Sequence, residues 1–319
     1  MCGRTFCAID PRCIQKSCEF TDPTTGEQVR PQWCDAPTDD VYTPSYNIGP
    51  TRFTPVLMSG QHCAADKVQQ RVIQPMRWGL IPQWHKGDRS SFKAMHNNCR
   101  GETIVSKPIF SVPFKKGRRC VVVAQGFYEW KTEKGKKIPY LFSARPQDIK
   151  PIDLKKVKDE NLEAKVSIKD AATESADPSK ASLIFMAGIF DVWKESESSP
   201  LYSYSILTTN ATGAVSDVHH RMPVLLESDK DIERWLNYED YPSTEVMDLI
   251  GPKDLLTSHQ VTDKVNNVRY QEPDCPLPVS KDESKPLKKG DIRNFFSKTE
   301  STKRKSELPE DPTIKKEKI

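Results

Sequence analysis

The chain begins with MCGRTFCAID, which places a cysteine directly after the initiator methionine. With Met1 retained, Cys2 is an ordinary thiol near the end of the chain. With Met1 removed, Cys2 is the first residue, and its thiol and free α-amine lie on neighbouring carbons. The second form is a different reagent, because two nucleophiles of one residue can then attack the same electrophile.

A glutamate between aromatic residues is the next candidate. The segment GFYEWK follows the apolar run CVVVA and places Glu129 between Tyr128 and Trp130. A carboxylate held among aromatic rings is partly desolvated, which suits a general acid. The alternating pattern by itself slightly favours the other interpretation, a glutamate on the solvent face of a strand.

The segment DVHHRMP carries His219 and His220 ahead of an arginine and a turn-forming proline. Histidine is the side chain that exchanges protons near neutral pH. The chain has six histidines and no further ligands at suitable spacing around this pair, so a metal site is not predicted. The pattern supports a structural and a catalytic role for this loop equally.

Two further polar stretches can contact nucleic acid. MHNNCRGET contains Asn98, whose amide can hold an amine or an oxyanion, and Arg100, whose guanidinium can bind a phosphate. Asparagine runs are also common in ordinary turns. In RWGLIPQWHK, Trp84 is followed by a histidine and a lysine, which suits stacking on an unpaired base beside phosphate contacts.

The composition limits the class of protein. A formal net charge of +4 on 319 residues permits a polyanionic partner without demanding one. No apolar run approaches the roughly 20 residues that span a bilayer, and the N-terminus lacks a secretory signal, so we expect an intracellular protein without a membrane partner. The odd number of cysteines, nine, argues against a disulfide framework in an intracellular chain, and the absence of a Cys-x2-Cys pair argues against a structural zinc. No metal and no other cofactor is expected.

The residues between these motifs predict short strands. β-Branched and aromatic runs predict strands at residues 54–58, 76–82, 118–130, 138–144, 182–193 and 201–211, with a hairpin turn at Gly135. Helices are predicted from about Ser228 and over residues 243–250. Residues 146–180 lack an apolar period and predict an exposed insertion. The predicted fold class is a β-rich α+β domain over residues 2–278, followed by a disordered basic tail over residues 279–319.

Six short motifs occur in order along the chain: MCGR, YNIGP at residues 46–50, RWGLIPQW, NCR at residues 98–100, GFYEW and HHRMP. This set resembles the SRAP family from residue 2 to about residue 278, apart from the insertion. The resemblance implies one domain of open barrel-like sheets with a few helices. It also implies a monomer that senses abasic sites in single-stranded DNA and becomes covalently attached to them during replication-associated repair.

By the same resemblance, Cys2 is the nucleophile, Glu129 and His219 are catalytic, and Asn98 lies beside Cys2. His219 is preferred over His220 because the family motif reads His-x-Arg-Met/Arg-Pro. The resemblance also implies a set of residues at the DNA, namely Arg4, Asn47, Trp84, Arg100 and Trp130.

The implied chemistry uses the aldehyde form of an abasic site. The free amine of Cys2 can condense with the aldehyde to a Schiff base, and the thiol can then close a five-membered thiazolidine ring. An α-amine has a reference pKa of about 7.7 to 8.0, so an appreciable fraction is unprotonated near neutral pH. We expect Glu129 to move the proton needed to open the sugar, and His219 to stabilise the developing charge or the leaving hydroxide.

The C-terminal tail contains KKGDIRNFFSK, in which Ile292, Phe295 and Phe296 resemble the PIP box of partners of the sliding clamp PCNA. Lys289 replaces the usual glutamine, and a simple hydrophobic patch fits the segment nearly as well. Basic clusters in the tail favour nuclear import, so the nucleus is the expected location, with the cytoplasm as a second one.

Two other classes of function fit the sequence. One is a thiol autopeptidase or cysteine protease that uses Cys2, Glu129 and His219, which predicts peptide turnover without an abasic aldehyde. The other is a non-catalytic reader of modified bases in DNA, which predicts reversible binding that does not depend on Cys2.

Overall fold

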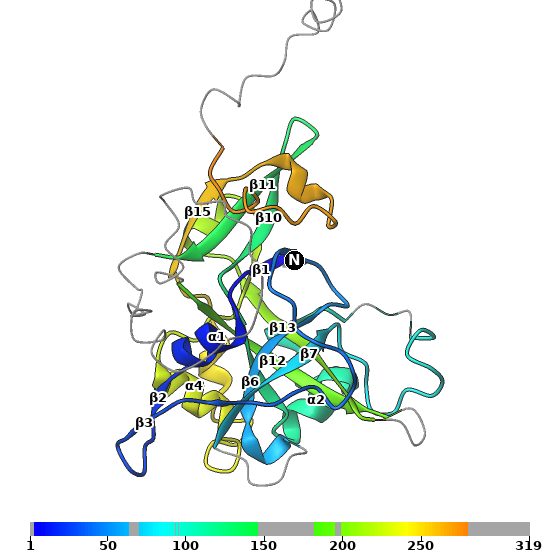
Figure 1. The fold of residues 1–319 in the computed structure, drawn as a ribbon, viewed down its shortest axis with the longest axis vertical. Coiled ribbons are helices and arrows are strands. Elements are labelled where there is room, and N and C mark those ends of the chain that lie inside the picture. Colours follow the sequence, from blue (N-terminus) through cyan, green and yellow to red (C-terminus); the bar gives the residue numbers. More distant parts are fainter. Residues whose placement is uncertain are drawn as a thin grey trace, which may run out of the picture. The chain divides into compact units, whose positions relative to one another are not determined.

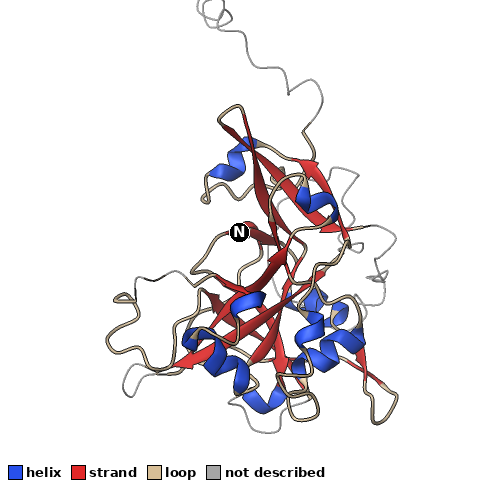
Figure 2. Cartoon of the chain, turned by 180° about the vertical axis from the view of Figure 1, so that it is seen from behind, coloured by secondary structure: helices blue, strands red, loops and turns tan. Residues whose placement is uncertain are grey.

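The computed structural model describes residues 3–63, 70–92, 94, 96–145, 182–194 and 199–279. Cys2, the predicted insertion at 146–180 and the predicted clamp-binding residues Ile292, Phe295 and Phe296 lie outside the described residues. The chain up to Pro278 forms one compact unit. Strands make up most of its regular structure, which confirms the predicted β-rich fold class (Figures 1 and 2).

Five strands form a closed barrel in the order β6, β7, β13, β12 and β9. Neighbouring strands are antiparallel, except that β7 and β13 run parallel through the pairs Arg77–Ser203 and Trp78–Tyr204 and so close the circuit. The bounds are β6 Phe53–Ser59, β7 Arg71–Trp78, β9 Arg119–Ala124, β12 Ile184–Trp193 and β13 Leu201–Asn210. The strand predicted at residues 76–82 therefore begins earlier and ends at Trp78, because Gly79 takes a left-handed φ of 109°.

Short strands extend the barrel at its edges. β4 (Gln32–Trp33) pairs with β7, whereas β8 (Asn98–Arg100) and β14 (Arg221–Pro223) both pair with β13. The NCR and HHRMP motifs are thus attached to the same barrel strand. β2 (Phe20–Thr21) and β3 (Gln28–Val29) form a separate small hairpin.

A second sheet of five antiparallel strands has the order β15, β11, β10, β1 and β5. Its strands are β1 Thr5–Cys7, β5 Ser45–Ile48, β10 Gly126–Glu133, β11 Lys136–Ala144 and β15 Leu256–Gln260. Lys134 and Gly135, with φ values of 48° and 77°, form the two-residue turn between β10 and β11. The hairpin predicted at Gly135 is confirmed.

The strand predicted over residues 118–130 is two strands in two different sheets. β9 ends at Ala124 in the barrel, and β10 begins at Gly126 in the second sheet. Gln125 joins them, and its side chain accepts a hydrogen bond from the Ala8 amide at 2.7 Å. Gly126 permits a close approach of β10 to β11 within the second sheet, because a Cβ there would lie 2.5 Å from the Phe142 carbonyl oxygen.

Most helices lie beside the barrel rather than beside the second sheet (Figure 2). The predicted helix after Ser228 is α4 (Asp229–Leu236), and the Ser228 hydroxyl caps it by accepting from the Asp231 amide at 3.1 Å. Its Trp235 is 0% exposed and donates to the Cys120 carbonyl at 2.9 Å. The remaining helices are α1 Pro11–Ser17, α2 Pro108–Lys115 and α3 Gly213–Ser216, with 3-10 turns at Gly60–His62, Gly101–Thr103, Met247–Leu249 and Asp263–Asn266. Among the described residues, no helix has the length and apolar character needed to cross a membrane.

The helix predicted over residues 243–250 is wrong. This segment consists of turns and the short 3-10 helix Met247–Leu249. Arg234 binds the Glu245 carbonyl at 2.8 Å and the Asp248 carboxylate at 2.8 and 2.9 Å. These tertiary contacts hold the segment in a turn and override its weak helical propensity.

We expect Gly126→Ala to lower the free energy of unfolding by about 1 to 3 kcal/mol, because the added methyl overlaps backbone that cannot move away. Gly251→Ala is the matched control: its Cβ would meet no atom closer than 4.0 Å, so we expect a change within about 0.5 kcal/mol. Urea unfolding of both variants measures the difference. Equal midpoints would contradict the close approach of β10 and β11 at Gly126.

Candidate functional site

The pleat of β10 separates Glu129 from its aromatic sequence neighbours. Tyr128 and Trp130 pack into a small cluster with Phe6 and Val265, whereas Phe127 stacks on Phe142 in the main core. Because side chains alternate along a strand, Glu129 shares the face of Phe127. The expected position between two aromatic rings is therefore wrong, since both rings lie on the opposite face.

Glu129 is nevertheless buried, with 4% of its surface exposed. This excludes the solvent-facing glutamate that the pattern alone slightly favoured. Directly across from it on β11 is Tyr140, and Lys131 follows two residues later on the same face. Neither Tyr140 nor Lys131 was predicted as a neighbour of Glu129. The alternation of side chains along IPYLFSA and GFYEWK indicates that they can share its face.

The first described residues run alongside this part of β10. β1 pairs with β10 through Thr5–Phe127 and Phe6–Gly126, and the Tyr128 amide donates to the Arg4 carbonyl at 2.8 Å. Continued by one residue, the same register sets Gly3 across from Glu129.

The loop of His219 is fixed by main-chain contacts. The His219 amide donates to the Val215 carbonyl at 2.8 Å. The Nδ1 atom lies 3.0 Å from the Arg221 amide and 3.1 Å from the Arg221 carbonyl. These two contacts at Nδ1 hold the ring against the main chain of the loop.

The two histidines of the loop differ in their surroundings. Their rings stack at 4.4 Å, but His220 is exposed whereas His219 is half-buried. The proximity of His219 lowers the pKa of His220, and Arg100 adds a smaller effect in the same direction. The fixed ring of His219 fits a catalytic role better than the exposed ring of His220.

Arg221 fastens this loop to the barrel. Its guanidinium forms a fork with Glu102 at 2.7 and 2.8 Å, and it also donates to Asn210 Oδ1 at 2.8 Å and the Thr208 carbonyl at 2.7 Å. Arg221 is 5% exposed, and its hydrogen bond lowers the pKa of Glu102. Sequence reasoning gave Arg221 no role, although an arginine inside the apolar end of HHRMP is an indication of a buried ion pair.

Asn98 and Arg100 lie on β8, at the end of β13 that also carries the histidine loop. Asn98 pairs with Ile206 and Arg100 with Thr208, while Thr208 also pairs with Pro223 of β14. Asn98 is half-buried and Arg100 is exposed. The structure thus brings Asn98, Arg100 and the His219 loop to one end of β13.

The segment that follows β13 contacts the second sheet. α3, which leads into the histidine loop, packs against β15 of the second sheet. The pKa of Lys131 is raised chiefly by its hydrogen bond to Glu133, with smaller effects of Tyr140 and Asp217.

Arg4 and Asn47 are engaged inside the protein. Arg4 Nη1 donates to Asn47 Oδ1 and to the Val265 carbonyl, both at 2.7 Å, and its guanidinium lies 5.6 Å from the Trp130 ring centroid. Asn47 is 1% exposed, and its Nδ2 lies 3.0 to 3.2 Å from the carbonyls of residues 265, 267 and 270. The predicted DNA contact of Asn47 conflicts with this burial. Its side chain instead holds Arg4.

Of the two tryptophans predicted at the DNA, Trp130 lies on the second sheet and Trp84 lies on a loop. Trp130 is half-buried on β10 and donates from Nε1 to Asn266 Oδ1 at 2.5 Å. Trp84 is 58% exposed. Its loop is held to β12 because the Gln83 amide donates to an Asp191 carboxylate oxygen at 2.8 Å. An exposed ring on an anchored loop can stack on an unpaired base.

Most described cysteines are poor nucleophiles. Burial raises the thiol pKa at seven of the eight described cysteines, namely Cys7, Cys13, Cys18, Cys34, Cys99, Cys120 and Cys275. At Cys99, between Asn98 and Arg100, the pKa is raised to about 12. Since the thiolate is the reactive form, these residues compete weakly for an electrophile. In the described part of the chain, no three His, Cys, Asp or Glu side chains are placed to hold a metal ion.

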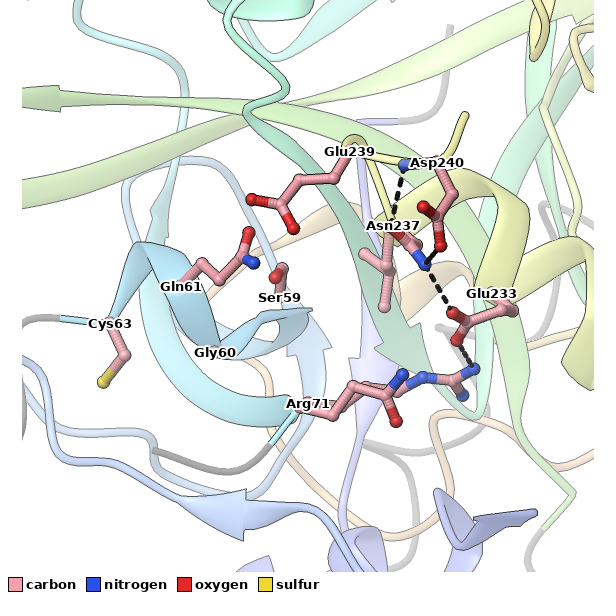
Figure 3. Close-up of a pocket in the computed structure, with 11 residues that line it drawn as sticks. Ser59, Gly60, Gln61, Cys63, Arg71, Glu233, Asn237, Glu239 and Asp240 are labelled. Atoms are coloured by element: carbon pink, nitrogen blue, oxygen red, sulfur yellow. Dashed lines mark hydrogen bonds and ion pairs between the residues drawn. The ribbon is translucent and has the colours of Figure 1, made fainter. Parts of the chain in front are cut away.

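A hollow of about 440 Å³ lies between the end of β6, the start of β7 and the end of α4 (Figure 3). None of the predicted site residues lines it. Its one arginine, Arg71, is paired with Glu233 at 2.5 Å, and Glu239 and Asp240 add two further carboxylates. The excess of negative charge disfavours a polyanion, so this hollow is not a candidate for the DNA site.

A family profile and several named relatives match this chain. The profile of the family described as SOS response associated peptidase (SRAP) matches residues 1–268. The Gallus gallus protein named abasic site processing protein HMCES is 38% identical over 283 residues, which cover 88% of this chain and 78% of the relative. Abasic site processing protein YoqW of Bacillus subtilis is 30% identical over 237 residues, covering 73% of this chain and 85% of the relative.

Solved structures share the fold. A crystal structure of a Bordetella bronchiseptica protein matches with a TM-score of 0.55 at 19% identity, covering 82% of this chain and 100% of that chain. One from Bacteroides thetaiotaomicron gives a TM-score of 0.53 at 23% identity, covering 73% of this chain and 85% of that chain. The profile match and the relatives above 30% identity together establish that the chain belongs to the SRAP family.

Proposed function

We propose that this protein processes abasic sites in single-stranded DNA by forming a covalent cross-link through Cys2 after removal of Met1. The observation that carries this proposal is the register of β1 on β10, which sets Gly3 across from the buried Glu129. Residue 2 is one peptide unit further, or about 3.8 Å between Cα atoms. Relatives over 30% identical are named abasic site processing proteins, which supports the choice of substrate.

The reaction proceeds in two balanced steps. The unprotonated α-amine attacks the open-chain aldehyde, and loss of one water gives an imine. The thiol then adds across the carbon–nitrogen double bond, and its proton passes to nitrogen, which closes the thiazolidine. Because amine and thiol belong to one residue, the second step is intramolecular and has a high effective concentration.

Glu129 and His219 supply the proton transfers. Opening of the closed sugar needs a proton moved from one oxygen to another, and a buried carboxylate within reach is suited to that task. His219 stabilises the developing charge, since the contacts at Nδ1 hold its ring against the main chain of the loop. Asn98, at the same end of β13, offers an amide to hold the amine or the sugar oxygen.

The DNA strand is held by exposed basic and aromatic groups. Arg100 is exposed beside the histidine loop, and Trp84 presents an open ring on its anchored loop. Phosphate contacts give affinity without sequence preference, and stacking favours unpaired bases. Together they support a preference for single strands.

A second candidate function is a thiol autopeptidase, which the family description as a peptidase favours. It would use the same Cys2, Glu129 and His219 to cleave a peptide bond. The clamp contact of Ile292, Phe295 and Phe296 and the nuclear location are further proposals that rest on sequence, since these residues lie outside the described part of the chain.

We expect Cys2→Ser to abolish the stable adduct, because a hydroxyl cannot close the sulfur ring. The measurement is a denaturing gel of the protein with an abasic and an intact single strand. Cys63→Ser is the matched control, because it makes the same change at a half-buried free cysteine elsewhere in the chain. It should cross-link like the wild type. A gel-stable adduct with the intact strand, or with Cys2→Ser, would contradict the proposal; peptide cleavage without any adduct would favour the autopeptidase.

Glu129→Gln should slow cross-linking by about 100-fold or more, since general acid–base catalysis contributes about 10²- to 10⁴-fold. The affinity for DNA should stay unchanged, because Glu129 is buried. Glu133→Gln, on the exposed end of the same strand, should react at the wild-type rate. Single-turnover kinetics separates the rate from the affinity, and a wild-type rate for Glu129→Gln would exclude its catalytic role.

Arg100→Gln should weaken binding of abasic and intact strands alike and reduce the slope of log affinity against log salt by about 0.7. The reason is the loss of one phosphate contact, with one fewer counterion released. Fluorescence anisotropy at several salt concentrations measures the slope, with the exposed Arg12→Gln as control. An unchanged slope for Arg100→Gln would place the DNA elsewhere.

A further inference from the structure

The side chain of Arg4 points into the protein and not out towards a DNA strand. It is half-buried, and one of its nitrogens, Nη1, already donates to Asn47 Oδ1 and the Val265 carbonyl at 2.7 Å each. Such charge-assisted hydrogen bonds are short and about twice as strong as neutral ones. Arg4 is therefore fixed to the interior of the second sheet.

We propose that Arg4 is a positioning residue, which holds the start of the chain in the register that sets Gly3 across from Glu129. This inference rests on the proposed function, because it concerns the placement of the proposed nucleophile. Arg4 does not touch the reacting atoms in this scheme. It pairs across from Tyr128 and so lies on the face of β10 opposite Glu129, and it acts through the backbone of the chain.

The start of the chain needs such an anchor. β1 has only three residues, Thr5–Cys7, and chain ends fray unless something ties them down. A slip of one residue along β10 would also turn every side chain of β1 to the other face. The side chain of Arg4, fixed at two acceptors, prevents that slip at the position next to Gly3.

The socket of Arg4 is itself preformed. Asn47 lies on β5, next to β1, and its amide nitrogen contacts the carbonyls of residues 265, 267 and 270. Gln271 donates to the Asn47 carbonyl at 2.7 Å, which ties the same segment to β5. Asn47 is 1% exposed and has no surface for DNA, so any effect of Asn47 on the reaction must pass through Arg4 or the fold.

The test measures the reaction and the binding separately. Single-turnover cross-linking at saturating abasic single strand gives the rate after binding. Anisotropy with a strand that carries a tetrahydrofuran analogue, which has no aldehyde, gives the affinity and its salt dependence. The variants are Arg4→Met, Arg4→Lys, Asn47→Ala and the double variant Arg4→Met/Asn47→Ala, with the exposed Arg12→Met as control.

Arg4→Met should lower the saturated rate by about tenfold to a hundredfold, as expected for a displaced nucleophile, and leave the affinity and the salt slope unchanged. Asn47→Ala should reproduce this loss, and the double variant should be no slower than the slower single variant. Arg4→Lys keeps the charge but loses the planar guanidinium whose Nη1 donates to both acceptors, so it should fold and react at an intermediate rate. Arg12→Met should match the wild type.

The opposite pattern would overturn the inference. A wild-type saturated rate in Arg4→Met or Arg4→Lys, together with weaker binding and a reduced salt slope, would make Arg4 a phosphate contact and leave the proposed function intact. Absence of any adduct in the wild type would instead remove the proposed function and this inference with it. Thermal unfolding of each variant shows whether a loss of rate comes from misfolding. If Arg4→Met misfolds, the saturated rate of Arg4→Lys is the test.

Discussion

The pairing of the first strand with β10 is the constraint on which the proposed site depends. Three residues of β1, Thr5–Cys7, and the carbonyl of Arg4 fix the start of the chain along Gly126–Glu133. A strand pair has a side-chain period of two, so this register determines what comes near Glu129. Every other part of the proposed chemistry needs this placement first, because an aminothiol at a frayed end would react no better than a free cysteine.

The rest of the fold makes that placement rigid. The barrel closes on itself through β7 and β13, and β13 then carries both β8 and β14 at one end. Buried ionic groups are paired where they hold loops, as in the fork of Arg221 and Glu102 under the histidine loop. Glu129, Asn98 and Arg100 thus lie on strands of two sheets, and Arg221 ties the histidine loop to the barrel, which limits the motion of the site. Burial keeps most of the other thiols protonated, so selectivity for one cysteine follows from the fold.

Local patterns predicted the elements but not their partners. β-Branched runs, the turn at Gly135 and the cap at Ser228 act over a few residues, and the structure confirms the strand character, the hairpin and α4. The interior contacts of Arg4 and Asn47 come from residues 265–270, more than 200 positions away, and no local pattern contains them. The division of residues 118–130 between two sheets was missed for the same reason. Glu129 was a candidate from the sequence, and the structure buries it on the face opposite its aromatic neighbours.

Peptide mapping of the protein–DNA conjugate by mass spectrometry tests the central claim most directly. The proposed chemistry predicts a single linked peptide that begins at Cys2, lacks Met1, and has the mass of peptide plus abasic strand minus one water. Such a mass with both the thiol and the amine blocked to alkylation identifies the ring. A linkage at any other residue, or a linked peptide that retains Met1, would contradict the proposal that position 2 supplies both nucleophiles.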